Sequence, residues 1–284
     1  MGKEPAAAAQ PTGYRARGTM EQPLFPEVVA RTDPGVSRHH NEDVVGFRVV
    51  PETNGVARAV LVVCDGMGGH PAGEVAAELG VRTVLEVGVN PRDASLAEQV
   101  CEALLAANAA ILREGLRDLR KRGMGATCVA ALLRGTELAV AHAGDCRAYL
   151  LSARGVRRLT SDHSWVGEQV RAGLLSEQQA HLSPFRSVVT RALGLDPTLQ
   201  PEVRHTVVQP DEVVLLCSDG LWDVLDDETI RRVVVTASDL ATAAEQLITL
   251  ANARGGPDNI SVVLARPASS ATTEPPLPGE DALA

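Results

Sequence analysis

Continuous runs of hydrophobic residues stand out first along this chain, and each ends at a polar residue. The runs at 59–64 and 213–217 consist of Val, Leu, Ala and Cys, and Asp65-Gly66 and Ser218-Asp219-Gly220 follow them directly. An unbroken apolar run of this length predicts a β-strand that is buried on both faces. Other apolar stretches predict further strands at 127–133, 137–143 and 260–265.

Apolar residues at helical spacing predict three helices between these strands. Ser95 and Glu98 form a capping-box pattern, and an apolar stripe follows over 96–111. A second stripe covers 240–251, and residues 72–87 give a third helix rich in Ala and Val. The strands and helices come in groups, which favours sheets covered by helices over a strictly alternating parallel sheet. We expect both stripes to face the core.

The chain of 284 residues suits one domain between two polar tails. Residues 1–27 and 267–284 are rich in Ala, Pro and Gly and lack periodicity, which predicts disordered tails. Residues 28–266 contain no linker and no internal repeat, so we expect them to form a single folded domain.

Composition excludes several classes of function. Aromatic residues make up 2% of the chain and the formal charge is −9, which argues against nucleic-acid binding. Neither a membrane span nor a secretory signal is evident, and the five cysteines form no CxxC pair. We therefore expect a cytoplasmic, monomeric protein with reduced thiols and no membrane partner.

Five aspartates lie at the ends of predicted strands, which is where chemistry is expected. A single Asp beside Gly is usually a turn residue. If the sheets bring five carboxylates at strand ends together, however, cations must offset their mutual repulsion. Their oxygens would suit Mn²⁺ or Mg²⁺, and there is no His/Cys cluster of the kind that binds zinc. The five are Asp43, Asp65, Asp145, Asp219 and Asp258.

These acids belong to a series of motifs that resembles the metal-dependent type 2C protein serine/threonine phosphatases, in their bacterial form. The resemblance covers about 28–266, and the motifs occur in the family's order and spacing. The motifs are TDPGVSRHHNED at 32–43, VCDGMGGH at 63–70, GMGAT at 123–127, AGDCR at 143–147, TRALG at 190–194, CSDGLWD at 217–223 and GPDNIS at 256–261.

This resemblance implies an α+β fold in which two antiparallel sheets pack as a β-sandwich with helices on both sides (αββα). It also implies a centre of two Mn²⁺ or Mg²⁺ ions, with a third, more weakly held ion. Asp65 would bridge the two ions and Gly66 would offer its carbonyl to one of them. Asp219 and Asp258 would bind the other, and Asp145 would help to hold the third.

The resemblance also assigns residues around the metals. Glu42 and Asp43 would orient water beyond the metal ligands, and Arg38 would grip the substrate phosphate with its two-pronged guanidinium. A metal-activated water would then hydrolyse phosphoserine or phosphothreonine without a covalent intermediate. Many eukaryotic members have His directly after the Asp-Gly, whereas this chain has Met67, so the general acid stays unassigned.

Two other functions remain open: a non-catalytic regulator that binds phosphoproteins, and a two-metal hydrolase of a small phosphorylated metabolite. The regulator is disfavoured because none of the acids at 65, 219 and 258 is missing. Cys128 and Arg134 fit the Cys-x5-Arg pattern of thiol phosphatases, but the segment is apolar and reads as a core strand. The preferred hypothesis is a phosphatase that opposes bacterial Ser/Thr kinases.

Several polar residues near these motifs have simpler interpretations. We expect His142 to be a satisfied core residue, His39 and His40 to be exposed, and Arg147 to pair with a nearby acid. Residues 164–187 show a helical pattern that breaks at Pro184. In bacterial relatives this region is a mobile flap beside the active site, although a surface insertion without a catalytic role is almost as good a reading.

Overall fold

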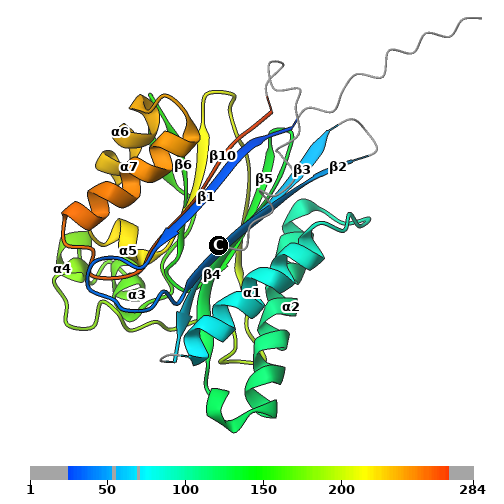
Figure 1. Ribbon diagram of the computed structural model, residues 1–284, viewed down its shortest axis with the longest axis vertical. Helices are drawn as coiled ribbons and strands as arrows, with labels where there is room; N and C mark the ends of the chain where they lie inside the picture. The colour runs from blue at the N-terminus through cyan, green and yellow to red at the C-terminus, as the bar shows by residue number, and fades with distance from the viewer. Residues whose placement is uncertain (1–24, 53–55, 69–70, 269–284) are drawn as a thin grey trace, which may run out of the picture.

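The computed structural model describes residues 25–268 except 53–55 and 69–70, and these residues form two antiparallel sheets (Figure 1). The strand order of the first sheet is β1-β10-β9-β6-β7, and that of the second is β2-β3-β4-β5-β8. The bounds in the first sheet are β1 Glu27–Asp33, β6 Arg147–Ser152, β7 Gly155–Arg158, β9 Val213–Cys217 and β10 Ile260–Arg266. Those in the second are β2 Asp43–Pro51, β3 Ala57–Met67, β4 Gly125–Arg134, β5 Glu137–Ala143 and β8 Glu202–Val207.

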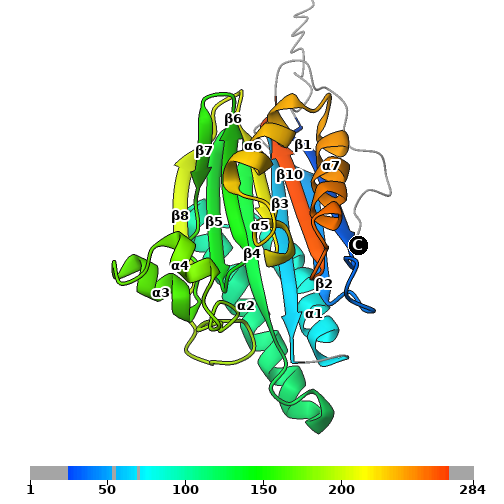
Figure 2. The same cartoon turned by 90° about the vertical axis from the view of Figure 1, so that its left-hand side faces the viewer.

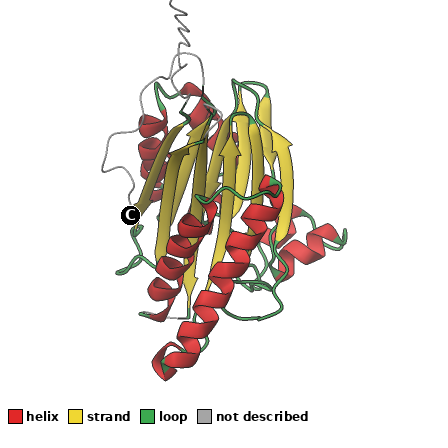
Figure 3. Cartoon of the chain, turned by 90° about the vertical axis from the view of Figure 1, so that its right-hand side faces the viewer, coloured by secondary structure: helices red, strands yellow, loops and turns green. Residues whose placement is uncertain are grey.

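The sheets pack face to face, and helices cover the outer face of each (Figures 2 and 3). Helices α1 (Ala72–Gly88) and α2 (Leu96–Arg117) cover the second sheet, and α6 (Asp227–Thr236) and α7 (Leu240–Ala253) cover the first. This is the four-layer α+β sandwich that the motifs predicted.

Alternation along each central strand builds the layers. In β3, Leu61 and Val63 point between the sheets, whereas Val62 and Cys64 point toward α1 and α2. Both sets are fully buried, which confirms the prediction that this run is a strand buried on two sides. The predicted capping box is also present, because the Ser95 side chain accepts from the Glu98 amide and the Glu98 carboxylate accepts from the Ser95 amide.

The structure describes only a few residues of the two predicted tails. β1 begins at Glu27 and Phe25 is buried, and Pro267 is buried after the last strand. Residues 1–24 and 269–284 of the predicted tails lie outside the described residues. Within the described part of the chain, no helix combines the length and apolar character that crossing a membrane requires.

Short helices occupy two further segments, and the apolar pattern predicted only the first of them. The region at 164–187 contains two short helices, α3 (Trp165–Arg171) and α4 (Glu177–His181), and α4 ends before Pro184. A further short helix, α5 (Asp219–Trp222), begins at one of the predicted metal ligands. The 3-10 turn η1 (Leu119–Lys121) links α2 to β4.

Candidate metal centre

The predicted acids come together at one end of the sandwich. Asp43 and Asp65 face each other on the paired strands β2 and β3. Asp145 lies in the turn between β5 and β6, Asp219 begins α5 just after β9, and Asp258 precedes β10. The Asp65 carboxyl is close enough to the other four carboxyls to interact electrostatically with each, although the five residues come from separate segments of the chain.

Burial and mutual repulsion disfavour the ionised form of four of these carboxyls, those of Asp43, Asp65, Asp145 and Asp219. Burial is the larger cause, and it raises the pKa of Asp43 to about 7 and that of Asp145 to about 6. The pKa values of Asp65 and Asp219 lie well above the usual range for the same reason, with neighbouring carboxylates adding to the shift. Among the ion pairs of the described residues, one reaches this set, Arg38 with Asp258. Such a group of oxygens fits divalent cations of the Mg²⁺ and Mn²⁺ type, which would neutralise it.

Gly66 is held where only a glycine fits. Its amide donates to the Glu42 carbonyl at 3.1 Å. A Cβ at this position would lie 2.3 Å from the Gly73 carbonyl oxygen, which belongs to α1. A Cβ on Gly73 would lie 2.1 Å from the Glu42 carboxylate. The end of β3 and the start of α1 therefore approach each other as bare backbone, with the Glu42 side chain packed against them.

Asp43 is positioned by hydroxyl groups from the other sheet. It is 4% exposed, and the Ser218 hydroxyl donates to its carboxylate at 2.6 Å. The Ser218 hydroxyl also accepts from the Ser261 amide at 3.0 Å. No role for Ser218 could be read from the sequence, because a serine before Asp-Gly has the ordinary signature of a turn.

Asn259 is a second residue whose role the sequence did not indicate. Its side-chain oxygen accepts from the Glu42 amide at 2.8 Å, and its side-chain nitrogen donates to the Pro34 and His40 carbonyls, both at 2.9 Å. Asn259 is 5% exposed. One amide group therefore fixes the loop that carries Arg38 against the loop that carries Asp258.

Arg38 lies at the edge of the acidic cluster. Its Nη2 donates to the Asp258 carboxylate at 2.7 Å, while 55% of its side chain remains exposed. The guanidinium is thus both close to a predicted metal ligand and open to a substrate. His39 and His40 are exposed, as predicted.

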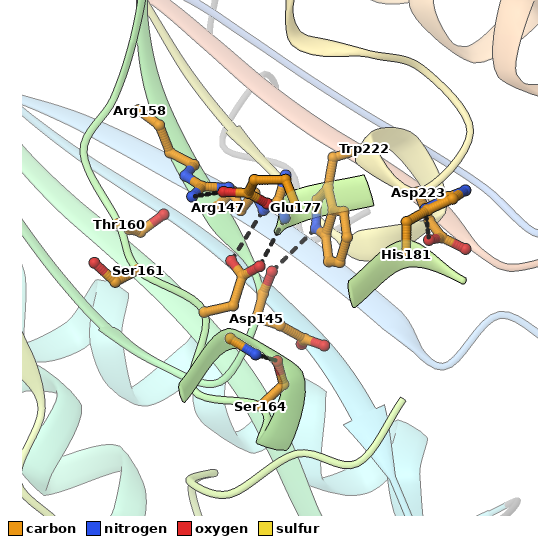
Figure 4. A network of polar contacts seen from close by, with 12 residues as sticks. Asp145, Arg147, Arg158, Thr160, Ser161, Ser164, Glu177, His181, Trp222 and Asp223 are labelled. Atoms are coloured by element: carbon orange, nitrogen blue, oxygen red, sulfur yellow. Dashed lines mark hydrogen bonds and ion pairs between the residues drawn. The ribbon is translucent and has the colours of Figure 1, made fainter. Parts of the chain in front are cut away.

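A cavity of about 510 Å³ opens beside Asp145 and Asp219, under the helices α3 and α4. Arg147 lines this cavity, and it donates to the Asp162 carboxylate through two nitrogens, at 2.9 and 2.6 Å. Its guanidinium also stacks 3.6 Å from the centre of the Trp222 ring, and the Trp222 indole N–H donates to the Asp145 carbonyl at 3.0 Å (Figure 4). The predicted pairing of Arg147 with an acid is confirmed, and the partner is Asp162.

The helices over this cavity are tied to the domain by ion pairs. Glu177 of α4 accepts from Arg158 at 3.0 Å, and His181 of α4 lies 3.3 Å from Asp223 (Figure 4). Asp223 also lies 3.7 Å from Arg186. The segment 164–187 therefore forms the outer wall of the cavity next to the acidic cluster.

His142 and His163 form a buried stack behind the Asp145 turn. Their ring centres are 4.4 Å apart and the planes differ by 12°. Together with Glu202 they lie close enough to one another, among the described residues, to suggest a metal site. Because the two rings are nearly parallel, however, the lone pairs of their ring nitrogens point in parallel directions and do not converge on one ion. His142 contacts the Ser161 carbonyl at 2.9 Å, which confirms it as a satisfied core residue.

His163 supports the turn that carries Asp145. Burial lowers its pKa to about 4, so the ring is neutral, and its Nδ1 accepts from the Gly144 amide at 3.3 Å. The Cys128–Arg134 segment is part of β4, and Cys128 is fully buried, so the reading as a core strand is confirmed.

Comparison with known proteins gives one consistent family. The protein phosphatase 2C family matches residues 37–260. The chain is 34% identical over 238 residues to the serine/threonine phosphatase stp of Listeria monocytogenes, covering 82% of this chain and 93% of that protein.

Solved structures agree with this match. The serine/threonine phosphatase PstP/Ppp of Mycobacterium tuberculosis superposes with a TM-score of 0.76 at 35% identity, over 87% of this chain and all of that one (100%). The catalytic domain of PstP in complex with two manganese ions gives a TM-score of 0.74 at 34% identity, over 87% of this chain and 100% of that one.

The raised carboxyl pKa values predict how pH acts on stability. In the presence of a chelator, the free energy of unfolding should fall as pH rises from about 4 to about 7, because Asp43 and Asp145 keep protons in the folded state that they lose when unfolded. Urea denaturation of the wild type and of Asp145→Asn gives the free energy of unfolding of each across this pH range. The difference between the two pH profiles is the contribution of the Asp145 carboxyl. Mn²⁺ should stabilise the wild type more at pH 7.5 than at pH 5.

The control for this measurement is Asp211→Asn, which changes an exposed carboxylate far from the cluster. A profile for Asp145→Asn that runs parallel to the wild type would contradict the assignment of a strained carboxyl cluster.

The contacts of Asn259 predict a local effect of its substitution. Asn259→Asp keeps the size of the side chain but removes the two N–H bonds to Pro34 and His40. We expect amide hydrogen exchange in peptides covering 34–42 to accelerate by about tenfold or more, since each such bond contributes ~1 kcal/mol. Asn90→Asp, at an exposed amide on the end of α1, serves as the control. Unchanged exchange at 34–42 would show that Asn259 does not hold the loop.

Proposed function

This chain belongs to the protein phosphatase 2C family, and from that premise we propose that it removes phosphate from phosphoserine and phosphothreonine in proteins with the help of two Mn²⁺ or Mg²⁺ ions. The observation that carries the proposal is the meeting of Asp65, Asp219 and Asp258 at one end of the sandwich. The named activity of the stp and PstP relatives and the two manganese ions of the PstP structure support it.

In this proposal the acidic cluster divides into ligand sets. Asp65 and the carbonyl of Gly66 would hold one ion, Asp65 with Asp219 and Asp258 would hold the other, and Asp145 with Asp219 would hold a third. When bound, the ions supply an acidified water as the nucleophile and neutralise charge on the phosphoryl group. Every ligand is an oxygen, which matches the preference of these hard cations.

The surrounding residues orient the reactants. Arg38 binds two phosphoryl oxygens and holds the phosphorus beside Asp258, which is already its hydrogen-bonding partner. Glu42 and Asp43 accept hydrogen bonds from water in the site, and Ser218 keeps Asp43 in place. Met67 has no proton to give, so water in the site protonates the departing serine or threonine oxygen.

The proposal extends to the biological setting. The substrates include Ser/Thr kinases, whose phosphorylation the protein reverses, and the protein acts as a monomer. Residues 28–266 make up the phosphatase domain. We place the protein in the cytoplasm, where its five free cysteines, four of them buried, would stay reduced.

The decisive experiment measures hydrolysis of 4-nitrophenyl phosphate and of a phosphothreonine peptide with and without Mn²⁺. Activity should require the ion, and Asp65→Asn should lower kcat by about 100-fold or more, while Asp211→Asn leaves it unchanged. Circular dichroism checks that the variant is folded. Activity that survives chelation, or that thiol alkylation abolishes, would overturn the proposal, and faster turnover of small phosphorylated metabolites than of peptides would favour a metabolite hydrolase.

Arg38→Ala should act mainly on substrate binding. Loss of a two-pronged, charge-assisted contact of about 1.5–3 kcal/mol should raise KM for both substrates by about 10–100-fold with a smaller change in kcat. Arg38→Lys should recover part of the affinity, and Arg31→Ala, on the exposed edge of β1, should have no effect. A lower kcat with unchanged KM would count against the binding role of Arg38.

A further inference from the structure

We propose that the end of α2 and the turn after it form a docking surface for an acidic and partly apolar segment that flanks the phosphorylated residue of protein substrates. This inference rests on the proposed phosphatase function. The docking surface consists of Arg113, Leu116, Arg117, Leu119 and Arg122. These residues lie at the last turns of α2, in η1 and directly after it.

The apolar side chains of the docking surface are unusually exposed to solvent. Leu116 is 81% exposed and Leu119 is 79% exposed, which are the highest values for large hydrophobic residues in the described part of the chain. The earlier stripe of α2, from Leu96 to Ile111, is buried against the second sheet. The final turns of α2 extend past the sheet (Figures 1 and 2), and these two leucines stay largely uncovered by the part of the chain that the structure describes.

The charged side chains of the docking surface carry an excess of positive charge. The carboxylates of this segment already have partners, since Glu114 pairs with Lys121 at 2.6 Å and Asp118 with Arg120 at 2.9 Å. Arg113, Arg117 and Arg122 are exposed, and none has a carboxylate within ion-pair distance among the described residues. In a chain with a net charge of −9, this local excess of cations complements an anionic partner.

The docking surface leads directly into the metal end of the sandwich. Only Gly123 and Met124 separate Arg122 from the first residue of β4. β4 begins opposite Met67, two residues beyond Asp65, and a Cβ on Gly68 would lie 3.3 Å from the Met124 Cα. A substrate segment of about five extended residues spans ~17 Å, so the flank of a bound phosphoresidue can reach this surface.

A substrate segment fits these features better than a membrane does. Two leucines offer little area for insertion into lipid, whereas alternating Arg and Leu can contact the acidic and aliphatic side chains of one peptide. Charge at this position would also raise the rate of encounter with a phosphorylated, anionic protein more than it would affect the chemistry.

The test compares substrates that share the phosphate but differ in the flank. One phosphothreonine peptide carries Asp, Glu and Leu on both sides, a second carries Gly and Ala, and 4-nitrophenyl phosphate has no flank. We expect Arg113→Glu/Arg117→Glu to lower kcat/KM for the acidic peptide by about tenfold, with less effect in high salt. Leu116→Ser/Leu119→Ser should lower it independently of salt, and 4-nitrophenyl phosphate should be hydrolysed as by the wild type.

The matched control is Arg82→Glu/Arg232→Glu, which makes the same change of charge at exposed arginines of α1 and α6. Equal hydrolysis of the acidic peptide by the wild type and both docking-surface variants would overturn the proposal, as would an equal loss of activity on all three substrates. Binding to phosphatidylglycerol vesicles that the leucine variant loses, with unchanged peptide kinetics, would assign the surface to membranes instead. Failure of the wild type to hydrolyse any of the substrates would refute the phosphatase function itself.

Discussion

Repulsion among carboxylates at one end of the sandwich is the constraint on which the other features of the site depend. Asp65 faces Asp43 across a strand pair and feels the charges of Asp145, Asp219 and Asp258. The domain brings these groups together at a cost in solvation and Coulomb energy, which bound protons offset at low pH and divalent cations would offset at neutral pH. Helix packing, turn geometry and hydroxyl contacts around the cluster keep it in place despite that cost.

The packing of the sandwich can hold the carboxylates together despite this cost in free energy. Its two sheets bury continuous aliphatic faces between and outside them, and close packing of this kind resists deformation. The acids then lie on short turns that begin where the strands stop. Gly66, with no side chain, lets the end of β3 approach α1, and the indole of Trp222 fixes the Asp145 carbonyl. Charged groups are thereby placed by a framework that is itself apolar.

The groups that would meet the substrate are attached to this framework by a few specific contacts. Asn259 connects the Arg38 loop to the Asp258 loop, so the position of the arginine proposed to bind phosphate depends on the same segment as a proposed metal ligand. The helices at 164–187 close the cavity beside Asp145 through ion pairs at their surface. Core packing therefore supports the metal site, whereas polar contacts that are weaker and more exposed support the substrate side.

The local pattern of apolar and polar residues determined many features of this protein, because the burial of a strand and the buried face of a helix both follow from repeats of a few residues. The apolar runs at 59–64 and 213–217, the capping box at Ser95 and the aspartates at the strand ends could all be read from the chain. Only the tertiary structure decided which polar groups meet. The Asn259 contacts join residues 217 to 225 positions apart, and Ser218 meets Asp43 across 175. A turn-forming Asn or Ser looks the same in sequence whether it faces water or pins a distant loop, since its partner is set by the packing of the two sheets.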